Sequence, residues 1–450
     1  MATTTTPNGV HVGAQEPSQA GNDARNINTR DDDHISPGEI AVGVVIGRAS
    51  EYFDFFVYAI ASVLVFPSLL FPFDGRLEGT LYAFTIFSFA FIARPIGTVI
   101  SMAIQRRYGR EAKLTGALLL LGSTTAGIAF LPSYADSGFY AILILSLLRI
   151  GQGLALGGSW DGLPSLLALN APENKRGWYA MLGQLGAPTG FFIAAGLFWY
   201  LIGNLTDLDF MDWGWRYPFY VAFAINVVAL FARLRLTSTS EYAKLLEERE
   251  LQPTSVMEMA SSQGRNLIIG ALAALASYAL FHLVTVFPLS WITIYSPRSV
   301  SGFLGTQMIG VVLMAVGVVA SGVIADRIGR RRTLGTLAIL IAVFSGFVPM
   351  LLNGGEGAQD TFIMLGFALL GLSYGQAAGA VTANFPAQYR YTGAAFTSDL
   401  AWLVGAGFAP LVALGVSSQF GLAYVGLYLL SGAVCSLAAL SLNRRLDIRN

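Results

Sequence analysis

The stretch Gly47-Arg48-Ala49-Ser50-Glu51-Tyr52-Phe53-Asp54-Phe55-Phe56 lies in the middle of an apolar segment that covers about residues 40–66. A segment of this length predicts a helix that crosses a bilayer, which needs ~20 apolar residues at ~1.5 Å each. Arg48, Glu51 and Asp54 nevertheless place three charges near its centre, where each costs ~2.5–3.5 kcal/mol on an insertion scale. Their three-residue spacing puts them on one broad face of the helix. We therefore expect this face to line a polar cavity or to pair its charges internally.

The composition is that of a membrane protein. Of 450 residues, 54% are hydrophobic and 12% are charged, against ~25% charged in soluble domains, and the mean hydropathy is +0.59. The only cysteine, Cys435, cannot form an internal disulfide, and the three histidines show no metal-ligand spacing. We therefore expect no metal and no cofactor. The sequence has no Gly-x-x-x-x-Gly-Lys loop for a nucleotide, and it predicts neither an enzyme nor a nucleic-acid-binding protein.

Apolar segments of spanning length recur along the chain. They cover about residues 40–66, 79–104, 114–132, 139–168, 178–203, 217–234, 266–296, 302–325, 334–352, 361–385, 392–416 and 420–442. The sequence thus predicts an all-α membrane protein with twelve transmembrane helices in two pseudo-symmetric six-helix bundles. The expected divisions are a disordered cytoplasmic tail over 1–37, bundles over 38–235 and 265–442, a cytoplasmic linker over 236–264, and a tail over 443–450.

The distribution of basic residues predicts the orientation in the membrane. Arg and Lys gather in the loops after even-numbered segments, Arg233 among them, whereas the opposite loops hold only Arg76, Arg216 and Arg298. By the positive-inside rule, both termini are expected in the cytoplasm. We expect a monomer that crosses a bacterial cytoplasmic (inner) membrane several times.

Two basic turns occur in both halves. Arg106-Arg107-Tyr108-Gly109-Arg110 follows the second segment and Asp326-Arg327-Ile328-Gly329-Arg330 follows the eighth, and the glycines are 220 positions apart. Lys175-Arg176-Gly177 and Arg390-Tyr391-Thr392-Gly393 match at a similar offset, as do Gly186-Ala187-Pro188 and Ala409-Pro410. A duplicated six-helix unit is typical of secondary transporters, in which the substrate binds between the halves near the midplane.

Glu51 and Asp54 are the candidates for proton coupling. Two neighbouring acids in a medium of low dielectric ionise together only at a large cost, so one of them is expected to carry a proton. The alternative for Glu51 is an internal ion pair with Arg48. Arg149, in the middle of the fourth segment, suits a carboxylate substrate because its guanidinium offers two parallel donors. The alternative for Arg149 is a structural pair with Glu51 or Asp54.

Further polar residues lie within the apolar segments or at their ends. The candidates for the cavity wall are Gln184, Tyr278, His282, Tyr374, Gln376 and Asp399. Residues of this kind more often form hydrogen bonds between helices than bind a ligand. Arg94 is expected to snorkel or to brace the inner gate, and Asp161 either gates or lies solvated at the interface. The basic turns are expected to close the cytoplasmic face with Arg106, Arg110, Asp326, Arg327, Arg330 and Arg390.

Several of these motifs resemble a known family. Asp326-Arg327-x-Gly-Arg-Arg and the layout of six plus six segments are similar to the major facilitator superfamily. Within that superfamily, residues 38–440 resemble the metabolite:proton symporters. The motifs that carry this resemblance are Glu51-Tyr52-Phe53-Asp54-Phe55-Phe56-Val57-Tyr58, Ala93-Arg94-Pro95-Ile96-Gly97, Arg149-x-x-Gln152-Gly153, Trp213-Gly214-Trp215-Arg216-x-Pro218-Phe219 and Arg390-Tyr391-Thr392-Gly393. The resemblance implies a proton role for Glu51 and Asp54 and a substrate or coupling role for Arg149. Tyr58 and Gln152, in the same motifs, are candidate substrate-binding residues.

The sequence departs from this family at positions linked to coupling. In the turn after the second segment, Arg106 replaces the usual aspartate and Glu111 the final lysine. Gly157-Gly158-Ser159 lacks the usual glutamate, and an acid follows two places later at Asp161. Arg48 replaces a small residue, and it either adds a second cation for a di- or tricarboxylate or compensates for a shifted acid.

The sequence therefore favours a secondary active transporter that imports a small organic acid (a mono-, di- or tricarboxylate) with protons by alternating access. The family takes up organic acids such as citrate, oxoglutarate and shikimate, or zwitterionic osmolytes such as betaine and proline. Proton-coupled uptake of an osmolyte is therefore one alternative. An exporter or uniporter of the same fold is another, and a membrane sensor is a third. The expected partners are the substrate, the proton and the lipid bilayer.

Overall fold

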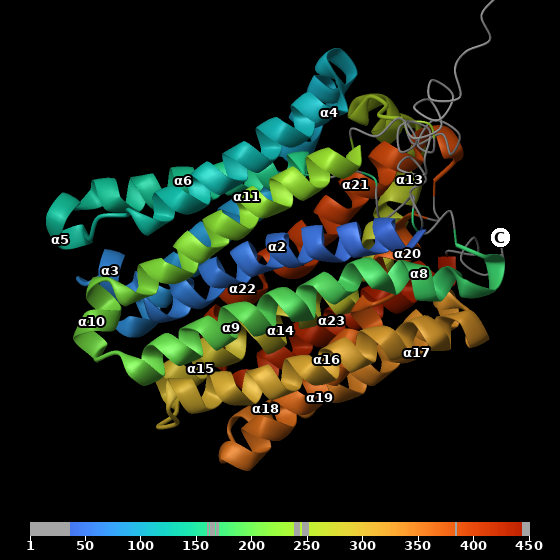
Figure 1. The fold of residues 1–450 in the computed structure, drawn as a ribbon. Coiled ribbons are helices and arrows are strands. Elements are labelled where there is room, and N and C mark those ends of the chain that lie inside the picture. The colour runs from blue at the N-terminus through green and yellow to red at the C-terminus, as the bar shows by residue number, and fades with distance from the viewer. Residues whose placement is uncertain are drawn as a thin grey trace, which may run out of the picture.

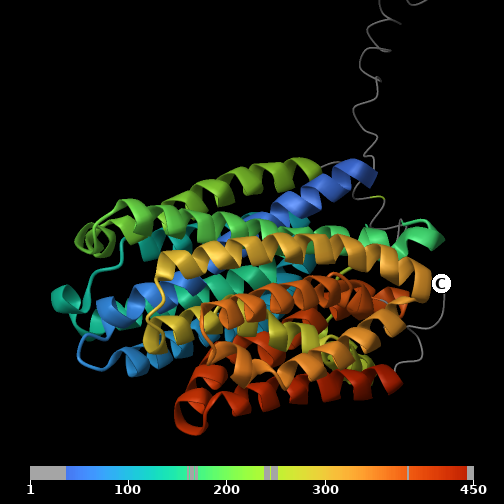
Figure 2. The same cartoon turned by 90° about the horizontal axis from the view of Figure 1, so that it is seen from below.

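The computed structural model describes residues 37–159, 162, 167, 171–237, 244, 252–382 and 385–442. Asp161, the tail over 443–450, nearly all of the expected N-terminal tail and part of the expected linker lie outside the described residues. Within the described residues, all regular secondary structure is helical. The helices run side by side along one common direction (Figures 1 and 2).

The first half of the chain forms the first six spans. Its elements are α2 (Pro37–Leu64), α3 (Phe66–Leu70), α4 (Arg76–Ala129), α5 (Tyr134–Ser137), α6 (Phe139–Gly158), η1 (Glu173–Lys175), α8 (Arg176–Leu182), η2 (Gly183–Leu185), α9 (Gly186–Asn204), α10 (Asp207–Asp212), η3 (Gly214–Arg216) and α11 (Tyr217–Thr237). The helix α2 lies inside this half, packed against α9, α11 and α4. The central stretch of the sequence is therefore surrounded by protein.

The second half forms the other six spans. Its elements are α13 (Val256–Ala273), α14 (Leu275–Thr285), α15 (Phe287–Tyr295), α16 (Val300–Ile328), α17 (Arg330–Ser345), α18 (Val348–Leu352), α19 (Glu356–Tyr374), α20 (Ala377–Thr382), α21 (Ala387–Ala401), η4 (Trp402–Gly407), α22 (Ala409–Phe420) and α23 (Leu422–Leu442). The two halves meet where α16 packs on α8 and α9, and where α21, η4 and α22 pack on α4.

The number of spans agrees with the twelve that the sequence predicts. Among the described residues, nine helices are long and apolar enough to cross a membrane. One of these, α4, contains two spans, because Gly109 interrupts it with φ 88° and the chain turns back there (Figure 1). The remaining two spans are α2 and the pair α17–α18.

The internal repeat is visible in the backbone. Gly109 and Gly329 have φ angles of 88° and 90°, in the region that glycine adopts without strain. Each reverses the chain after the second span of its half, at the end of the bundle where α2 begins and α23 ends (Figures 1 and 2). We call this the tail end. The two glycines predicted as equivalent therefore have the same conformation.

Several helix ends differ from the predicted ones. The fourth span ends at Gly158 rather than near residue 168, since the Gly157-Gly158 pair lacks helix propensity. The helix α13 begins at Val256, inside the expected linker, but its backbone is non-helical at Gln263, so a kink separates its first turns from the seventh span. Arg233, expected in a loop, belongs to α11, and its side chain is only 5% exposed. Its guanidinium is buried because a carboxylate on α2 faces it.

Two spans are irregular just before a proline at equivalent places of the two halves. In the fifth span the 3₁₀ turn η2 precedes Pro188, and in the eleventh the π-helix η4 precedes Pro410. A proline lacks the N–H that would bond the carbonyl one turn earlier, so the preceding turn changes its winding. These irregular turns bring Gln184 and Trp402 to the space between the halves.

Candidate functional site

A cavity lies between the two halves, near the middle of the bundle. It is lined by Arg48, Glu51, Tyr52, Phe55, Ala90, Phe91, Arg94, Arg149, Leu156, Gly183, Gln184, Tyr278, Tyr374, Ala378, Ala394, Ser398 and Trp402. The space not filled by atoms, including the open mouth, is about 860 Å³. Arg48 and Glu51 of the first helix therefore face a hollow shared by both halves, whereas Asp54 of the same helix does not line it.

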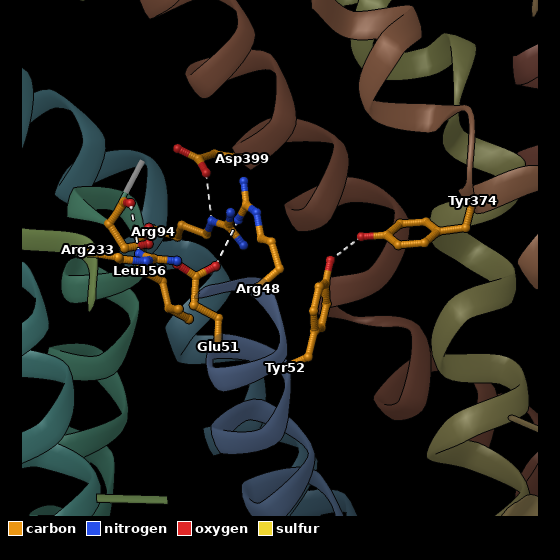
Figure 3. A network of polar contacts seen from close by, with 9 residues as sticks. Arg48, Glu51, Tyr52, Arg94, Leu156, Arg233, Tyr374 and Asp399 are labelled. Carbon is orange, nitrogen blue, oxygen red and sulfur yellow. Dashed lines mark hydrogen bonds and ion pairs between the residues drawn. The ribbon is translucent and has the colours of Figure 1, made fainter. Parts of the chain in front are cut away.

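Glu51 is held between two guanidinium groups. Its Oε2 lies 2.8 Å from Nη1 of Arg48, and its Oε1 lies 2.8 Å from Nη2 of Arg233 on α11 (Figure 3). Arg233 also donates to the carbonyl of Ser159 at 3.4 Å. The pair with Arg48 is the internal one that the sequence left open. A carboxylate held by two cations is stabilised in its ionised form.

Replacing Glu51 by glutamine is expected to destabilise the protein, because Arg48 and Arg233 lose their shared carboxylate. Breaking a buried ion pair by removing one partner costs ~3–5 kcal/mol. We expect a lower melting temperature of the purified protein in detergent, with partial recovery in the double variant Glu51→Gln/Arg233→Gln. Glu78→Gln, which changes an exposed acid in the first turn of α4, is the control. An unchanged melting temperature for Glu51→Gln would contradict this role.

Asp54 has a different environment from Glu51. It is 3% exposed, and its Oδ1 accepts a hydrogen bond from Oγ1 of Thr125 at 2.7 Å. Among the described residues, no guanidinium or ammonium nitrogen lies within 4 Å of its carboxylate. Asp54 is also not among the residues that line the cavity. Of the two candidate proton carriers, it is the one without an ion-pair partner in the described structure.

Arg149 is buried but reaches the cavity wall. It is 1% exposed, its Nε donates to the carbonyl of Phe87 at 3.2 Å, and its Nη1 donates to Oε1 of Gln152 at 3.0 Å. Its guanidinium carbon lies 3.9 Å from the centroid of the Tyr58 ring, a cation–π contact. Its Nη2 has no hydrogen-bond partner in the described structure. The structural pair with Glu51 or Asp54, left open by the sequence, is not formed.

Arg94 links the two halves on the tail side of the cavity. Its Nε lies 2.6 Å from Oδ1 of Asp399 on α21 (Figure 3). The hydroxyl of Thr98 donates to the same carboxylate. Arg94 also lies over the Trp402 ring, at 6.0 Å from the centroid. The side chain braces a contact between the halves, which is one of the two expectations for it.

An aromatic layer closes the opposite side of the cavity. The hydroxyls of Tyr52 and Tyr374 form a hydrogen bond across the halves (Figure 3). Phe55 stacks on His282 at 5.2 Å, and both lie near Trp402. Tyr278 also packs on Trp402, and it lines the cavity. His282 is fully buried and is not among the lining residues, so the layer rather than the substrate space contains it.

A second group of polar contacts joins the halves nearer the tail end. The carboxylate of Asp326 accepts from the backbone N–H of Gly177 at 2.6 Å and of Trp178 at 3.1 Å. Gln376, predicted at the cavity, instead donates to the carbonyl of Gly177 at 3.2 Å. Arg330 donates to Oε1 of Gln376 at 3.4 Å and to the carbonyls of Gly379 and Arg176. The second-half basic turn thus contacts the first half.

The other residues of the expected gate are dispersed. Arg106 donates to the carbonyl of Thr254, just before α13, at 2.9 Å. Arg110 follows the break at Gly109, and Arg390 lies in α21. Arg327 is exposed in the last turn of α16. Asp161 lies outside the described residues.

Charged side chains from both halves lie in and around the cavity. Among the described residues they are four arginines (Arg48, Arg94, Arg149 and Arg233) and three carboxylates (Glu51, Asp54 and Asp399). Within the described residues, no three His, Cys, Asp or Glu side chains form a group that could hold a metal.

Several residues of this site are absent from the sequence-based candidates. Among them are Tyr52, Thr98, Thr125, Arg233 and Trp402. Tyr52 is adjacent to Glu51 in the central stretch, and Trp402 precedes Ala409-Pro410. Both could therefore have been identified as candidate site residues by their proximity to these motifs. The two threonines carry no such signal, because hydroxyls in membrane helices usually bond their own backbone.

Comparison with known proteins gives consistent results. A sequence model described as Major Facilitator Superfamily matches residues 55–410. The chain is 38% identical to the inner membrane metabolite transport protein YhjE of Escherichia coli K12 over 414 aligned residues. The alignment covers 90% of this chain and 94% of YhjE. It is 30% identical to the shikimate transporter of the same organism, with 88% and 92% of the two chains covered.

More distant proteins extend the comparison. The proline/betaine transporter of Escherichia coli K12 is 26% identical over 430 residues, which cover 91% of this chain and 85% of that one. A crystal structure of a D-xylose–proton symporter superposes with a TM-score of 0.70 at 16% identity, covering 91% of this chain and 97% of the symporter chain. At this identity the superposition shows the fold alone, and it is the predicted one.

Proposed function

Because the chain belongs to the major facilitator superfamily, among the metabolite transporters that these relatives represent, we propose that it imports a small organic acid by proton symport. The chain is a multi-pass membrane transporter and not an enzyme. The proposal concerns its substrate class and its coupling ion. It also places the protein as a monomer in a bacterial inner membrane, with the tail end of the bundle in the cytoplasm.

The observation that carries the substrate class is the free Nη2 of Arg149. A fully buried guanidinium with one unsatisfied donor, on the wall of a cavity, is arranged to receive an anion. A substrate carboxylate there would satisfy that donor. Arg48 also lines the cavity but shares Glu51 with Arg233, which supports its role as a compensating charge.

The two acids of the first helix have different proposed roles. Asp54 loads and releases the proton, because it is the acid without an ion pair in the described structure. Glu51 keeps Arg48 and Arg233 in place. In each cycle the halves rock around the cavity, so the contact between Arg94 and Asp399 and the contacts of Asp326 must break on the tail side. The hydrogen bond between Tyr52 and Tyr374 must break when the opposite side opens.

A zwitterionic osmolyte is the second candidate substrate, and the aromatic wall of the cavity favours it. Six rings line the space, those of Tyr52, Phe55, Phe91, Tyr278, Tyr374 and Trp402. Aromatic faces attract quaternary ammonium groups, and Arg149 would bind the carboxylate of the same molecule.

Uptake into proteoliposomes tests the proposal. The purified protein is reconstituted, an inside-alkaline pH gradient is imposed, and labelled shikimate, citrate, oxoglutarate, betaine and proline are compared. We expect at least one of the organic acids to accumulate above its outside concentration and a protonophore to abolish this. Accumulation of betaine or proline alone would transfer the role to the osmolyte. Exchange without gradient-driven accumulation would replace symport by uniport or export.

A further inference from the structure

We infer that Thr125 is a positioning residue that couples the proton site at Asp54 to the anion site at Arg149 through Gln152. The inference rests on the proposed function and adds to it the connection between the two sites. Asp54 does not line the cavity, whereas Arg149 does. The protonation state of Asp54 must therefore act on the substrate site through the groups that lie between Asp54 and Arg149.

Four side chains form one directed chain of hydrogen bonds. Nη1 of Arg149 donates to Oε1 of Gln152 at 3.0 Å, and Nε2 of Gln152 donates to Oγ1 of Thr125 at 2.9 Å. The hydroxyl of Thr125 then donates to Oδ1 of Asp54 at 2.7 Å. Gln152, Thr125 and Arg149 are at most 1% exposed, so water does not compete for these bonds. The chain crosses three spans, on α6, α4 and α2.

The links between the two charges are neutral. A direct ion pair would cancel both charges and leave Arg149 without affinity for an anion. An amide and a hydroxyl instead keep Arg149 and Asp54 apart while each stays oriented by the other. Hydrogen-bonded groups in a low dielectric polarise one another. A change of charge at Asp54 therefore changes the electrostatic environment of the Arg149 guanidinium. No proton has to move along the chain for this.

Thr125 behaves differently from the threonine beside it. The hydroxyl of Thr124 bonds the carbonyls of Leu120 and Leu121 in its own helix, at 2.7 Å and 3.0 Å. Thr125 has no such bond among those described and donates to Asp54 instead. Two adjacent threonines on α4 thus differ in whether the hydroxyl leaves the helix. This difference provides a matched control.

The charged and titratable groups around this part of α2 come from several helices. Glu51 and Tyr58 lie on α2 itself, Arg149 on α6, Arg233 on α11 and His282 on α14. Glu51 is held by two arginines, and His282 lies in the aromatic layer. The chain through Thr125 is the described hydrogen-bonded path between Arg149 and Asp54. When Asp54 is ionised, Arg149 should attract an anion less than when Asp54 carries a proton.

The experiment compares Thr125→Val, Thr125→Ser and the control Thr124→Val in the purified full-length protein. Infrared difference spectra follow the C=O band of protonated Asp54, which Asp54→Asn identifies by its loss. Shikimate, citrate and oxoglutarate are added in turn, and the shift in the protonation of Asp54 on binding is measured. In wild type, each acid that binds should bind roughly tenfold more tightly when Asp54 is protonated, as for one hydrogen bond to a charged group.

In Thr125→Val, the ratio of the substrate affinities with Asp54 protonated and with Asp54 ionised should fall to about threefold or less, since one charged hydrogen bond is lost. The C=O band of protonated Asp54 should also change position. Thr125→Ser should restore the ratio, and Thr124→Val should keep it. If Thr125→Val does not fold, Gln152→Met interrupts the same chain on another helix and should give the same loss. A wild-type ratio in Thr125→Val would overturn the inference while leaving the transport proposal intact. A wild type whose Asp54 responds to none of the three acids would overturn both.

Discussion

Replacing Arg149 by alanine is expected to abolish uptake of the organic acid while the protein remains folded in the membrane. The change removes the donor at Nη2 that no described group satisfies. Loss of a charge-assisted hydrogen bond to a carboxylate corresponds to about a tenfold to hundredfold loss in kcat/KM. Folding is expected to persist because removing a buried cation without a carboxylate partner also relieves its desolvation.

Arg149→Lys separates charge from geometry at this position. A lysine keeps the positive charge but loses the two-point fork and the flat contact with the Tyr58 ring. We expect it to recover less than about a tenth of the wild-type kcat/KM, since bidentate sites distinguish the two residues. Arg107→Ala, in the exposed turn near Gly109, is the control for a lost arginine. Wild-type transport by Arg149→Ala at equal protein level would remove Arg149 from the substrate site.

The sequence predicts the fold and the charged face of the first helix well, because both depend on local patterns. Hydropathy identifies segments of spanning length, and spacing of three residues predicts that Arg48 reaches Glu51, as it does at 2.8 Å. The matched glycines of the basic turns predict the two chain reversals, which the φ angles of Gly109 and Gly329 show. Each of these inferences concerns neighbours within one helix or a repeated turn.

Contacts between helices are the part that a single sequence does not predict. The second partner of Glu51 is Arg233, which is 182 positions away and reads as part of a cytoplasmic loop. Thr125, in contact with Asp54, is 71 positions away and looks like any threonine of a membrane helix. Pro410 predicts a break in the eleventh span. It does not predict which side chain the irregular turn places at the cavity, because the position of Trp402 depends on the packing of η4. Such pairings follow from how the spans assemble.

Replacing Asp54 by asparagine is expected to uncouple transport from the proton gradient without abolishing substrate exchange. The amide has the size of the carboxyl and can still accept from Thr125, but it cannot take up and release a proton. One proton moving down a gradient of one pH unit supplies ~1.4 kcal/mol, about a tenfold accumulation of a substrate moved with no net charge. In Asp54→Asn vesicles this ratio should fall to about one, because no proton travels with the substrate.

Counterflow provides the decisive comparison for Asp54. Exchange of labelled for unlabelled substrate needs the binding site and the rocking motion but no net proton movement, so Asp54→Asn should retain it. Asp74→Asn, in the exposed turn between α3 and α4, should behave as wild type in both assays. Full gradient-driven accumulation by Asp54→Asn would exclude Asp54 as the proton carrier. Glu51 would then be the remaining acid of the first helix, and its two arginines would have to release it in each cycle, because a carboxylate held by Arg48 and Arg233 cannot take up a proton readily.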